Sequence, residues 1–329
     1  GQNPPVATIH DVARRAGVSI ATVSRSLNGH GRVSEQTRQR VLEIAESLDF
    51  RPSRTARGLV TGRLGNIGVL LPDVANPFYS PILAAIADIA QDRDLGVFLA
   101  DSREDPAAEE QLSPRLAEQV DALVLVSPRM PTAQINELAE RRHTVLVNRL
   151  EDGVDGVAVN AAAGMRAAVA HLADLGHRTI LYLDGPPASW SGAAKLAGIR
   201  QGADHSGVQV IVDGPHAPSY LGGREAADVV RHTDATAVIA YDDLIAWGLI
   251  TRLQQDGVSV PGDLSVVGFD DVIAEGMLTP ELTTVRSRGA SLGSAATKML
   301  LRRIDEPDYP VHHQRLSCEL VVRDSTAPR

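Results

Sequence analysis

The chain has 329 residues, 43% of them hydrophobic and 22% charged, a balance typical of a globular protein with more than one domain. No run of about 18 or more apolar residues occurs, which excludes a membrane-spanning helix. The single cysteine, Cys318, excludes an internal disulfide framework. Because the N-terminus is polar and carries no secretion signal, we expect a cytoplasmic protein.

The net charge of −9 is divided unevenly along the chain. Residues 1–63 contain ten arginines and five acidic residues and therefore carry +5, whereas the remaining residues carry −14. A small basic segment on an acidic body is the asymmetry expected of a nucleic-acid-binding head. A solvated charged face explains the same charges, so charge alone leaves both interpretations open.

Three short helices are predicted before residue 52. The apolar positions of the first form one helical stripe: Ile9, Val12, Ala13 and Ala16. Thr8 precedes this stripe and Asp11 follows three residues later, which is a variant of the capping box, and Gly17 ends the helix. Ser19 caps a second helix over about residues 20–28, and Ser34 caps a third. Short helices with a glycine-containing turn between the first two indicate a helix-turn-helix unit.

From residue 66 onward, short apolar runs alternate with amphipathic helices. The predicted strands are residues 67–71, 97–100, 122–126, 144–147, 179–183, 208–212, 237–240 and 264–269. Helices are predicted between them, for example over residues 81–94, 162–175, 222–232 and 244–255. Continuous apolar strands alternating with helices indicate parallel sheets covered on both faces, and their number favours two doubly wound subdomains.

Polar residues stand at or just past the carboxyl ends of these strands. They are Asp73, Asp101, Ser127, Asn148, Asp184, Asp242 and Asp270. Ligands of open α/β sheets bind outside those ends, so the set predicts a polar cleft suited to hydroxyls or amines. For each residue taken alone, capping of the following helix is an equal alternative.

The N-terminal segment contains a run of characteristic residues: Thr8-Ile9-His10-Asp11-Val12-Ala13-Arg14-Arg15-Ala16-Gly17-Val18-Ser19, then Thr22-Val23-Ser24-Arg25 and Asn28. This run closely resembles the DNA-binding head of the LacI/GalR family of transcriptional regulators. Further matches extend over nearly the whole chain: Val33-Ser34, Phe50-Arg51-Pro52, Ile67-Gly68-Val69, Asn76-Pro77-Phe78, Gly176-His177-Arg178 and residues 265–271.

The resemblance implies an N-terminal all-α helix-turn-helix headpiece and an α/β effector domain like the periplasmic sugar-binding proteins. We expect the headpiece over residues 1–52, a hinge helix over 53–62 and the effector domain over 63–329. The N-subdomain is expected at about residues 66–163 and 291–316. The C-subdomain is expected at about residues 164–290 and 317–329.

The second helix is expected to enter the major groove of operator DNA. The resemblance assigns base reading to Ile20, Ala21 and Arg25. Arg25 has the fork that binds guanine O6 and N7, and a phosphate contact is its alternative. Hydroxyl and amide side chains commonly contact DNA phosphates, and the expected anchors of this kind are Thr8, Ser19, Thr22, Asn28 and Ser34. Ser24 lies on the same face of the second helix as Ala21 and Arg25. The resemblance makes Leu59, beside Ala56, a wedge in the minor groove, although composition fits an ordinary packing residue equally well.

The resemblance also places an effector site in the cleft. Its expected residues are Phe78, Tyr79, Asn148, Lys195, Asp242 and Asp270, and Trp190 is added for stacking on a ring. The aromatic residues have packing in the core as their alternative. The family usually has an arginine at the position of Lys195, and a lysine there loses the bidentate geometry. It frequently has an asparagine at the position of Asp242, so the aspartate adds negative charge to the cleft. We expect a sugar or polyol effector first, and a nucleoside or amine-bearing metabolite, or a co-repressor, second.

Other classes of protein fit less well. No G-x-S-x-G, H-E-x-x-H or C-x-x-C motif is present, so we expect no enzyme, no catalytic residue, no cofactor and no metal site. A free sugar-binding transport protein would fit residues 66–329 but gives residues 1–62 no role. No heptad tail follows the effector domain, so we expect a homodimer formed through the first subdomain.

Overall fold

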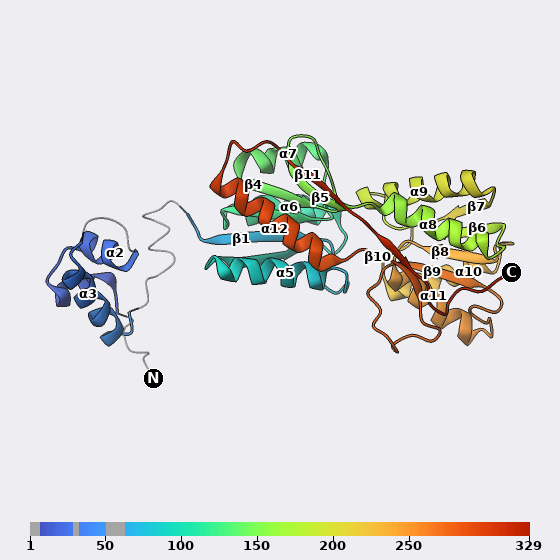
Figure 1. Cartoon of the computed structure of the whole chain (residues 1–329), viewed down its shortest axis with the longest axis horizontal. Helices are drawn as coiled ribbons and strands as arrows, with labels where there is room; N and C mark the ends of the chain where they lie inside the picture. The colour runs from blue at the N-terminus through green and yellow to red at the C-terminus, as the bar shows by residue number, and fades with distance from the viewer. Residues whose placement is uncertain (1–6, 29–32, 51–62) are drawn as a thin grey trace. The chain divides into compact units, whose positions relative to one another are not determined.

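The computed structural model describes residues 7–28, 33–50 and 63–329. The predicted hinge, with Ala56 and Leu59, lies outside these residues, as does the side chain of Asn28. The chain divides into two compact units, Gly1–Gly65 and Asn66–Arg329, and each is described by itself (Figure 1).

The first unit consists of three helices around a small apolar core. They are α1 (Ile9–Ala16), α2 (Ile20–Asn28) and α3 (Glu35–Ser47). Thr8 and Asp11 form the predicted capping box at the start of α1, and Ser34 caps α3 by accepting a hydrogen bond from the Thr37 main-chain nitrogen. Gly17 ends α1 with a φ of 67°, a left-handed conformation that glycine adopts without strain. The core is made of Val12, Ala13, Ala16, Val23, Val41 and Ala45.

The second unit contains two sheets of six strands. The first sheet has the order β11-β5-β4-β3-β1-β2, and all its paired strands are parallel. Its strands are β1 (Asn66–Leu71), β2 (Gly96–Asp101), β3 (Ala122–Val126), β4 (His143–Val147), β5 (Asp155–Val159) and β11 (His313–Leu316). One face packs on α5 (Tyr79–Asp92) and α12 (Gly289–Asp305). The other packs on α6 (Pro106–Ala117) and α7 (Thr132–Arg141).

The second sheet has the order β12-β10-β9-β8-β6-β7. Its strands are β6 (Thr179–Leu183), β7 (Gln209–Asp213), β8 (Ala237–Ala240), β9 (Ser265–Asp270), β10 (Thr283–Arg286) and β12 (Glu319–Val321). Helices α8 (Ala161–Asp174) and α9 (Trp190–Ser206) cover one face. Helices α10 (Tyr220–Val230) and α11 (Asp243–Gln255) cover the other. The fold is thus two doubly wound subdomains, with one difference from an all-parallel pattern: the edge strand β12 pairs antiparallel with β10.

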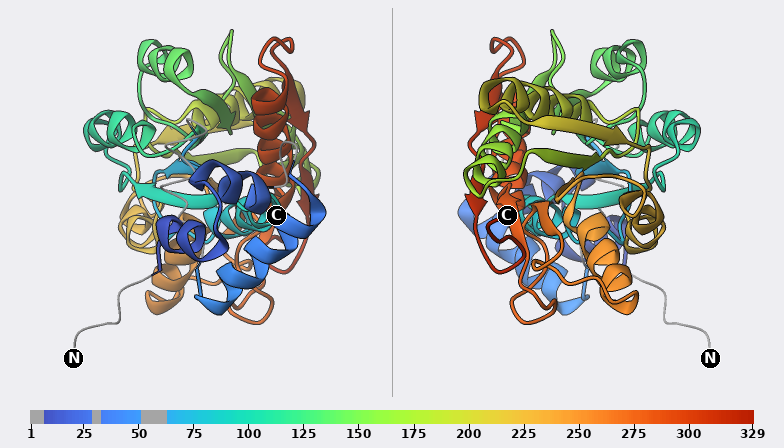
Figure 2. Two further views of the ribbon diagram at one scale, coloured as in Figure 1. Left: turned by 90° about the vertical axis from the view of Figure 1, so that its left-hand side faces the viewer. Right: turned by 90° about the vertical axis from the view of Figure 1, so that its right-hand side faces the viewer.

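The chain passes between the two sheets three times. It leaves the first sheet after β5, near residue 160, returns before α12, near residue 288, and leaves again between β11 and β12, near residue 317. The last crossing explains the antiparallel strand, because β12 follows β11 after two residues and enters the second sheet against the direction of β10. Figure 2 shows α12 and the β11 segment side by side along one flank of the unit.

Candidate functional site

A cavity lies between the two subdomains at the carboxyl ends of their strands. It is lined by Asn76, Phe78, Tyr79, Glu104, Ser127, Arg129, Asn148, Val159, Ser191, Lys195, Pro218, Tyr241, Asp242, Phe269 and Asp270. Its volume in this structure is about 20 Å³, enough for a single water molecule. The cleft is therefore nearly filled by its own side chains, and a ligand of sugar size requires it to widen.

The aromatic part of the wall stands at the start of α5. Phe78 and Tyr79 are 6% and 4% exposed, and their rings meet edge to face with centroids 5.0 Å apart. Asn76 fixes the turn before the helix, because its Oδ1 accepts a hydrogen bond of 3.0 Å from the Phe78 main-chain nitrogen. Burial raises the pKa of the Tyr79 hydroxyl well above its usual value, so this group is a neutral hydrogen-bonding side chain at ordinary pH.

Three of the polar residues at strand ends have strained backbones. Ser127, Asn148 and Asp270 have φ values of 46°, 57° and 108°, a backbone conformation that residues other than glycine rarely adopt. Such strain gathers at ligand sites because the surrounding structure holds the side chain at a required angle. Asn148 also has a buried Oδ1 with no hydrogen-bond partner among the described residues, and an unpaired buried acceptor is costly unless a ligand binds it.

An ion pair spans the first-subdomain wall. The Arg129 guanidinium donates hydrogen bonds of 2.9 and 3.1 Å to the two carboxylate oxygens of Glu104. The Arg129 main-chain nitrogen donates to Glu109, 2.8 Å away, which fixes the turn after β3. Since the fork of Arg129 is held by a protein carboxylate, its orientation in the cleft is set before any ligand arrives.

The C-subdomain supplies a fixed cation. Lys195 is 3% exposed, and its Nζ donates a hydrogen bond of 2.7 Å to the main-chain oxygen of Tyr241. The same nitrogen lies 3.9 Å from the centre of the Tyr241 ring and 4.0 Å from that of Phe269. The ammonium group is therefore stabilised by one carbonyl and two aromatic faces.

One buried carboxylate, Asp242, and one half-buried carboxylate, Asp270, complete the wall. Burial and the nearby charge of Asp270 raise the pKa of Asp242 to about 7, against the hydrogen bond from the Ile245 nitrogen and the charge of Lys195. Burial also raises the pKa of Asp270, while Lys195 and a 3.1 Å hydrogen bond from the Ser287 hydroxyl lower it. At neutral pH, Asp242 can both donate and accept hydrogen bonds, as a hydroxyl-rich ligand requires.

The headpiece presents the predicted reading face on α2. Ile20 is 41% exposed, Ala21 and Arg25 are exposed, and Val23 is buried on the opposite side. The Arg25 Nε donates to the Ala21 carbonyl, 3.1 Å away, so the side chain lies along its own helix. Among the predicted phosphate anchors, the Thr8, Ser19 and Ser34 hydroxyls are engaged at helix starts. The Thr22 hydroxyl is hydrogen-bonded to the Ser19 hydroxyl, 2.9 Å away, and Ser24 is half-buried.

Comparison with known proteins gives matches over both units. The family profile described as "Bacterial regulatory proteins, lacI family" matches residues 8–53, and that of the "Periplasmic binding protein-like domain" matches residues 169–326. The Catabolite control protein A of Priestia megaterium is 32% identical over 97% of this chain and 99% of its own length. The chain belongs to the LacI family of bacterial regulatory proteins.

Other LacI-family relatives agree with this assignment. The Ribose operon repressor of Halalkalibacterium halodurans is 31% identical over 97% of each chain. A crystal structure of the Lac repressor dimer bound to operator and the anti-inducer ONPF is 27% identical, with a TM-score of 0.86 over 98% of this chain and 100% of that one. An Enterococcus faecium LacI-family regulator with bound ribose is 31% identical, with a TM-score of 0.71 over 80% of this chain and 99% of that one. These relatives are transcriptional regulators rather than enzymes.

Six of the seven predicted effector residues line the cavity of this LacI-family chain. Trp190 does not line it, since its ring lies 5.9 Å from the Arg315 guanidinium and its neighbour Ser191 takes the place in the wall. Sequence reasoning did not assign Glu104 or Arg129 to the site. The only signal for Arg129 was its position two residues beyond the strand end at Ser127. No helix in the described ranges is long and apolar enough to cross a membrane, and no cluster of potential metal ligands occurs there.

Proposed function

We propose that this chain is a repressor that binds a pseudo-palindromic operator as a homodimer. A small molecule bound in the cleft raises or lowers its affinity for the operator. The proposed division is a headpiece at residues 1–52, a hinge at 53–62 and an effector domain at 63–329. The cleft is the observation that carries the proposal, because both subdomains contribute polar side chains to its wall and the buried Asn148 Oδ1 has no hydrogen-bond partner among the described residues. Acting on DNA, the protein would work in the cytoplasm.

A sugar or polyol is the first candidate for the effector. The cavity combines aromatic faces with carboxylate and amide groups, which suits a ring bearing many hydroxyls. Relatives solved with a ligand point the same way, since one contains ribose and another is a cellobiose complex. The second candidate is an amine-bearing metabolite, favoured by the pairing of Asp242 with Asp270 against the single lysine of the C-subdomain wall.

A dimer is supported by the exposed edge of the first sheet. β2 pairs only with β1, and its Val97, Phe98 and Leu99 are 36%, 42% and 46% exposed. Consecutive apolar side chains on an open strand edge are unfavourable in water unless a second surface covers them. We assign the dimer contact to this edge. No catalytic role is proposed for any residue.

The test begins with operator selection. Duplexes enriched from a random palindromic pool are measured by fluorescence anisotropy, with random duplex as reference. A thermal-shift screen of ribose, cellobiose, glucosamine and nucleosides then identifies an effector, whose effect on operator affinity gives the sign of regulation. An absence of preference for any palindromic duplex, with or without these compounds, contradicts the proposal.

A variant pair locates the effector site. Asp270→Ala removes a carboxylate from the cavity wall, so operator binding persists while the response to the effector weakens by roughly tenfold or more, as expected for a lost hydrogen bond to a charged group. Asp184→Ala is the control, because Asp184 also follows a strand but bonds the Gly185 nitrogen outside the cavity. An unaltered response in Asp270→Ala would remove this residue from the site.

A further inference from the structure

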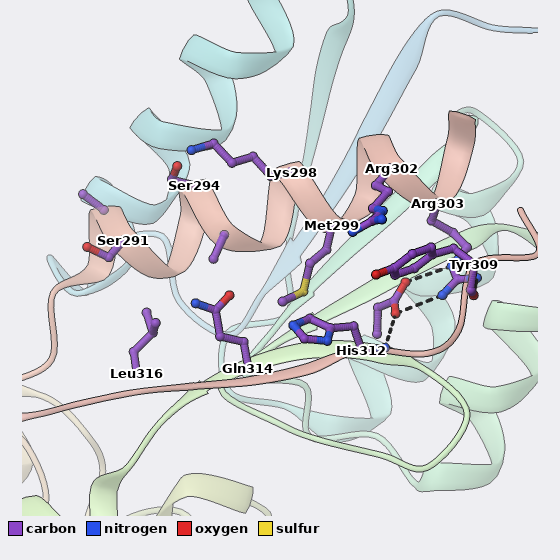
Figure 3. Close-up of a pocket in the computed structure, with 13 residues that line it drawn as sticks. Ser291, Ser294, Lys298, Met299, Arg302, Arg303, Tyr309, His312, Gln314 and Leu316 are labelled. Atoms are coloured by element: carbon purple, nitrogen blue, oxygen red, sulfur yellow. Dashed lines mark hydrogen bonds and ion pairs between the residues drawn. The ribbon is translucent and has the colours of Figure 1, made fainter. Parts of the chain in front are cut away.

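A second, larger hollow lies in the first subdomain, between α12 and the segment that leads into β11. Its volume is about 600 Å³, within the range of small-molecule sites. It is lined by Asp155, Ala290, Ser291, Ser294, Ala295, Lys298, Met299, Arg302, Arg303, Tyr309, His312, Gln314 and Leu316. Figure 3 shows Met299 of α12 converging with Gln314 and His312 from the facing segment. We call this hollow the α12 groove.

The α12 groove has a rigid end. Arg303 donates hydrogen bonds of 2.9 and 3.0 Å to Asp155, which also accepts one of 2.8 Å from the His312 main-chain nitrogen (Figure 3). Arg303 further donates to the carbonyl of Pro307, 2.9 Å away. These bonds fasten the segment before β11 to the helix. They also neutralise the only carboxylate that lines the groove, since Asp155 is 5% exposed and held by Arg303.

Two cations stand at the rim, and only Arg302 has an acidic partner among the described residues. Lys298 is exposed and has no hydrogen bond or ion pair among the described residues. Arg302, one turn later, has its Cζ 3.4 Å from the centre of the Tyr309 ring and its Nε 4.0 Å from the Glu306 carboxylate. Residues four apart share one helix face, so both side chains belong to the same face of α12, and Figure 3 shows the Lys298 side chain extended toward Ser294 rather than toward Arg302. On a body that carries −14 outside residues 1–63, this positive rim is a local exception.

The α12 groove also lies beside two of the three chain crossings between the subdomains. Ala290 and Ser291 belong to the first turn of α12, directly after the crossing near residue 288. Leu316 is the last residue of β11, directly before the crossing near residue 317. On the other side of the first crossing, the Ser287 hydroxyl donates to Asp270 in the cleft. A ligand in the groove would therefore contact two of the three connections that move when the cleft opens.

We propose that the α12 groove is a second small-molecule site that takes a small organic anion, such as a phosphate monoester. Its charge is held by Lys298 and Arg302, and its apolar part rests on Met299 and Leu316. Binding there restrains the two crossings and so changes the affinity of the effector cleft. By linkage, an effector in the cleft changes the affinity of the groove by the same factor.

The lysine content of the chain provides a specific probe of this site. The sequence holds only two lysines, and Lys195 is 3% exposed, so reductive ¹³C-methylation of the full-length protein labels Lys298 and the terminal amine. Methylation keeps the positive charge. The Lys298 signal is assigned with Lys298→Arg, and phenyl phosphate is then titrated at constant ionic strength, with phenol as its neutral counterpart. The terminal amine serves as the internal reference.

The expected result is a saturable shift of the Lys298 signal with phenyl phosphate and none with phenol. Arg302→Gln should weaken the apparent affinity about tenfold through the loss of one charged hydrogen-bonding group. Arg141→Gln is the matched control and should leave the affinity unchanged, since it removes one exposed arginine from α7, outside the groove. A shift that does not saturate, or that is equal in Arg302→Gln, overturns the site. This readout needs neither operator nor effector, so its failure is distinct from failure of the proposed function.

Hydrogen exchange tests the restraint. Peptides covering residues 286–290 and 315–319 should exchange more slowly at saturating phenyl phosphate, while a peptide from α7 should not change. Binding of phenyl phosphate without slower exchange in these two peptides would overturn the coupling between the groove and the crossings.

Discussion

Nζ of Lys195 is tied to the main-chain oxygen of Tyr241 by a hydrogen bond of 2.7 Å, and it lies over the ring of the same residue. This attachment makes the lysine a fixed element of the wall rather than a free arm. Its charge lowers the pKa of both Asp242 and Asp270, whose burial acts in the opposite direction. The cleft therefore depends on one buried cation to keep both of its aspartates, Asp242 and Asp270, ionisable.

Replacing this cation should destabilise the protein strongly. Lys195→Met keeps the length of the side chain but leaves the carboxylates and the Tyr241 carbonyl without their partner, at a cost of about 3 kcal/mol in the free energy of unfolding. Urea denaturation at pH 7.5 measures the change. Lys298→Met is the control, because this exposed lysine has no hydrogen bond or ion pair among the described residues and its loss should change stability by less than about 0.5 kcal/mol. Equal effects of the two substitutions would contradict the role given to Lys195.

The raised pKa of Asp242 predicts a dependence of stability on pH. The pKa of Asp242 is about 7 in the folded protein, whereas an aspartate in an unfolded chain has a pKa of 3.8. Between these values the folded state binds a proton that the unfolded state does not, so the contribution of Asp242 to stability falls as the pH rises through this window. Above about pH 7 the contribution stays constant.

Asp242→Asn isolates this contribution, because asparagine carries no charge and still caps a helix. The variant should gain stability relative to wild type as the pH rises from 5 to 7, with a slope of at most about 1.4 kcal/mol per pH unit, and level off above that. Urea denaturation curves of both proteins at several pH values give the difference. A difference that is independent of pH would show that the Asp242 carboxylate is not protonated preferentially in the folded state.

The fold was predictable because the buried strands are continuous apolar runs and the helices carry clear stripes. The strands that sequence reasoning missed are short or polar, as in β11, whose four residues are His313-Gln314-Arg315-Leu316. β5 was missed as well, since it begins with Asp155 and Gly156 and only three apolar residues follow them. The pairing of these strands is decided by long-range crossings, which local pattern does not encode.

The strand-end rule succeeded in part. Four of the seven polar residues, Ser127, Asn148, Asp242 and Asp270, line the cavity. The others fix local turns instead, because Asp73 binds the Ala75 nitrogen, Asp101 binds that of Arg103 and Asp184 binds that of Gly185. Position at a strand end thus brought residues to the right edge of the sheet. Which side chains turn inward depends on loop conformation, such as the left-handed backbone of Asn148.

The open edge at β2 predicts how the dimer can be broken. Phe98→Asp places a charge on the exposed apolar edge, so it should weaken dimerisation by about 2 kcal/mol or more, measured by sedimentation at decreasing protein concentration. Val311→Asp is the control, because Val311 is 45% exposed next to β11, the opposite edge of the same sheet. If both variants dimerise like wild type, the contact is not at β2.

Arg25 should decide the sequence preference of the headpiece. It is exposed on α2 beside Ile20 and Ala21, and its fork can bind both acceptors of a guanine in the major groove. Arg25→Ala should cost about 1–3 kcal/mol of discrimination between the selected operator and random duplex, while weak, salt-sensitive binding persists through phosphate contacts. Arg25→Lys keeps the charge but loses the fork, so it should restore general affinity without restoring the preference. Anisotropy titrations at two salt concentrations separate these effects. If Arg25→Ala weakens binding to both duplexes equally, the residue contacts phosphate and another side chain reads the bases.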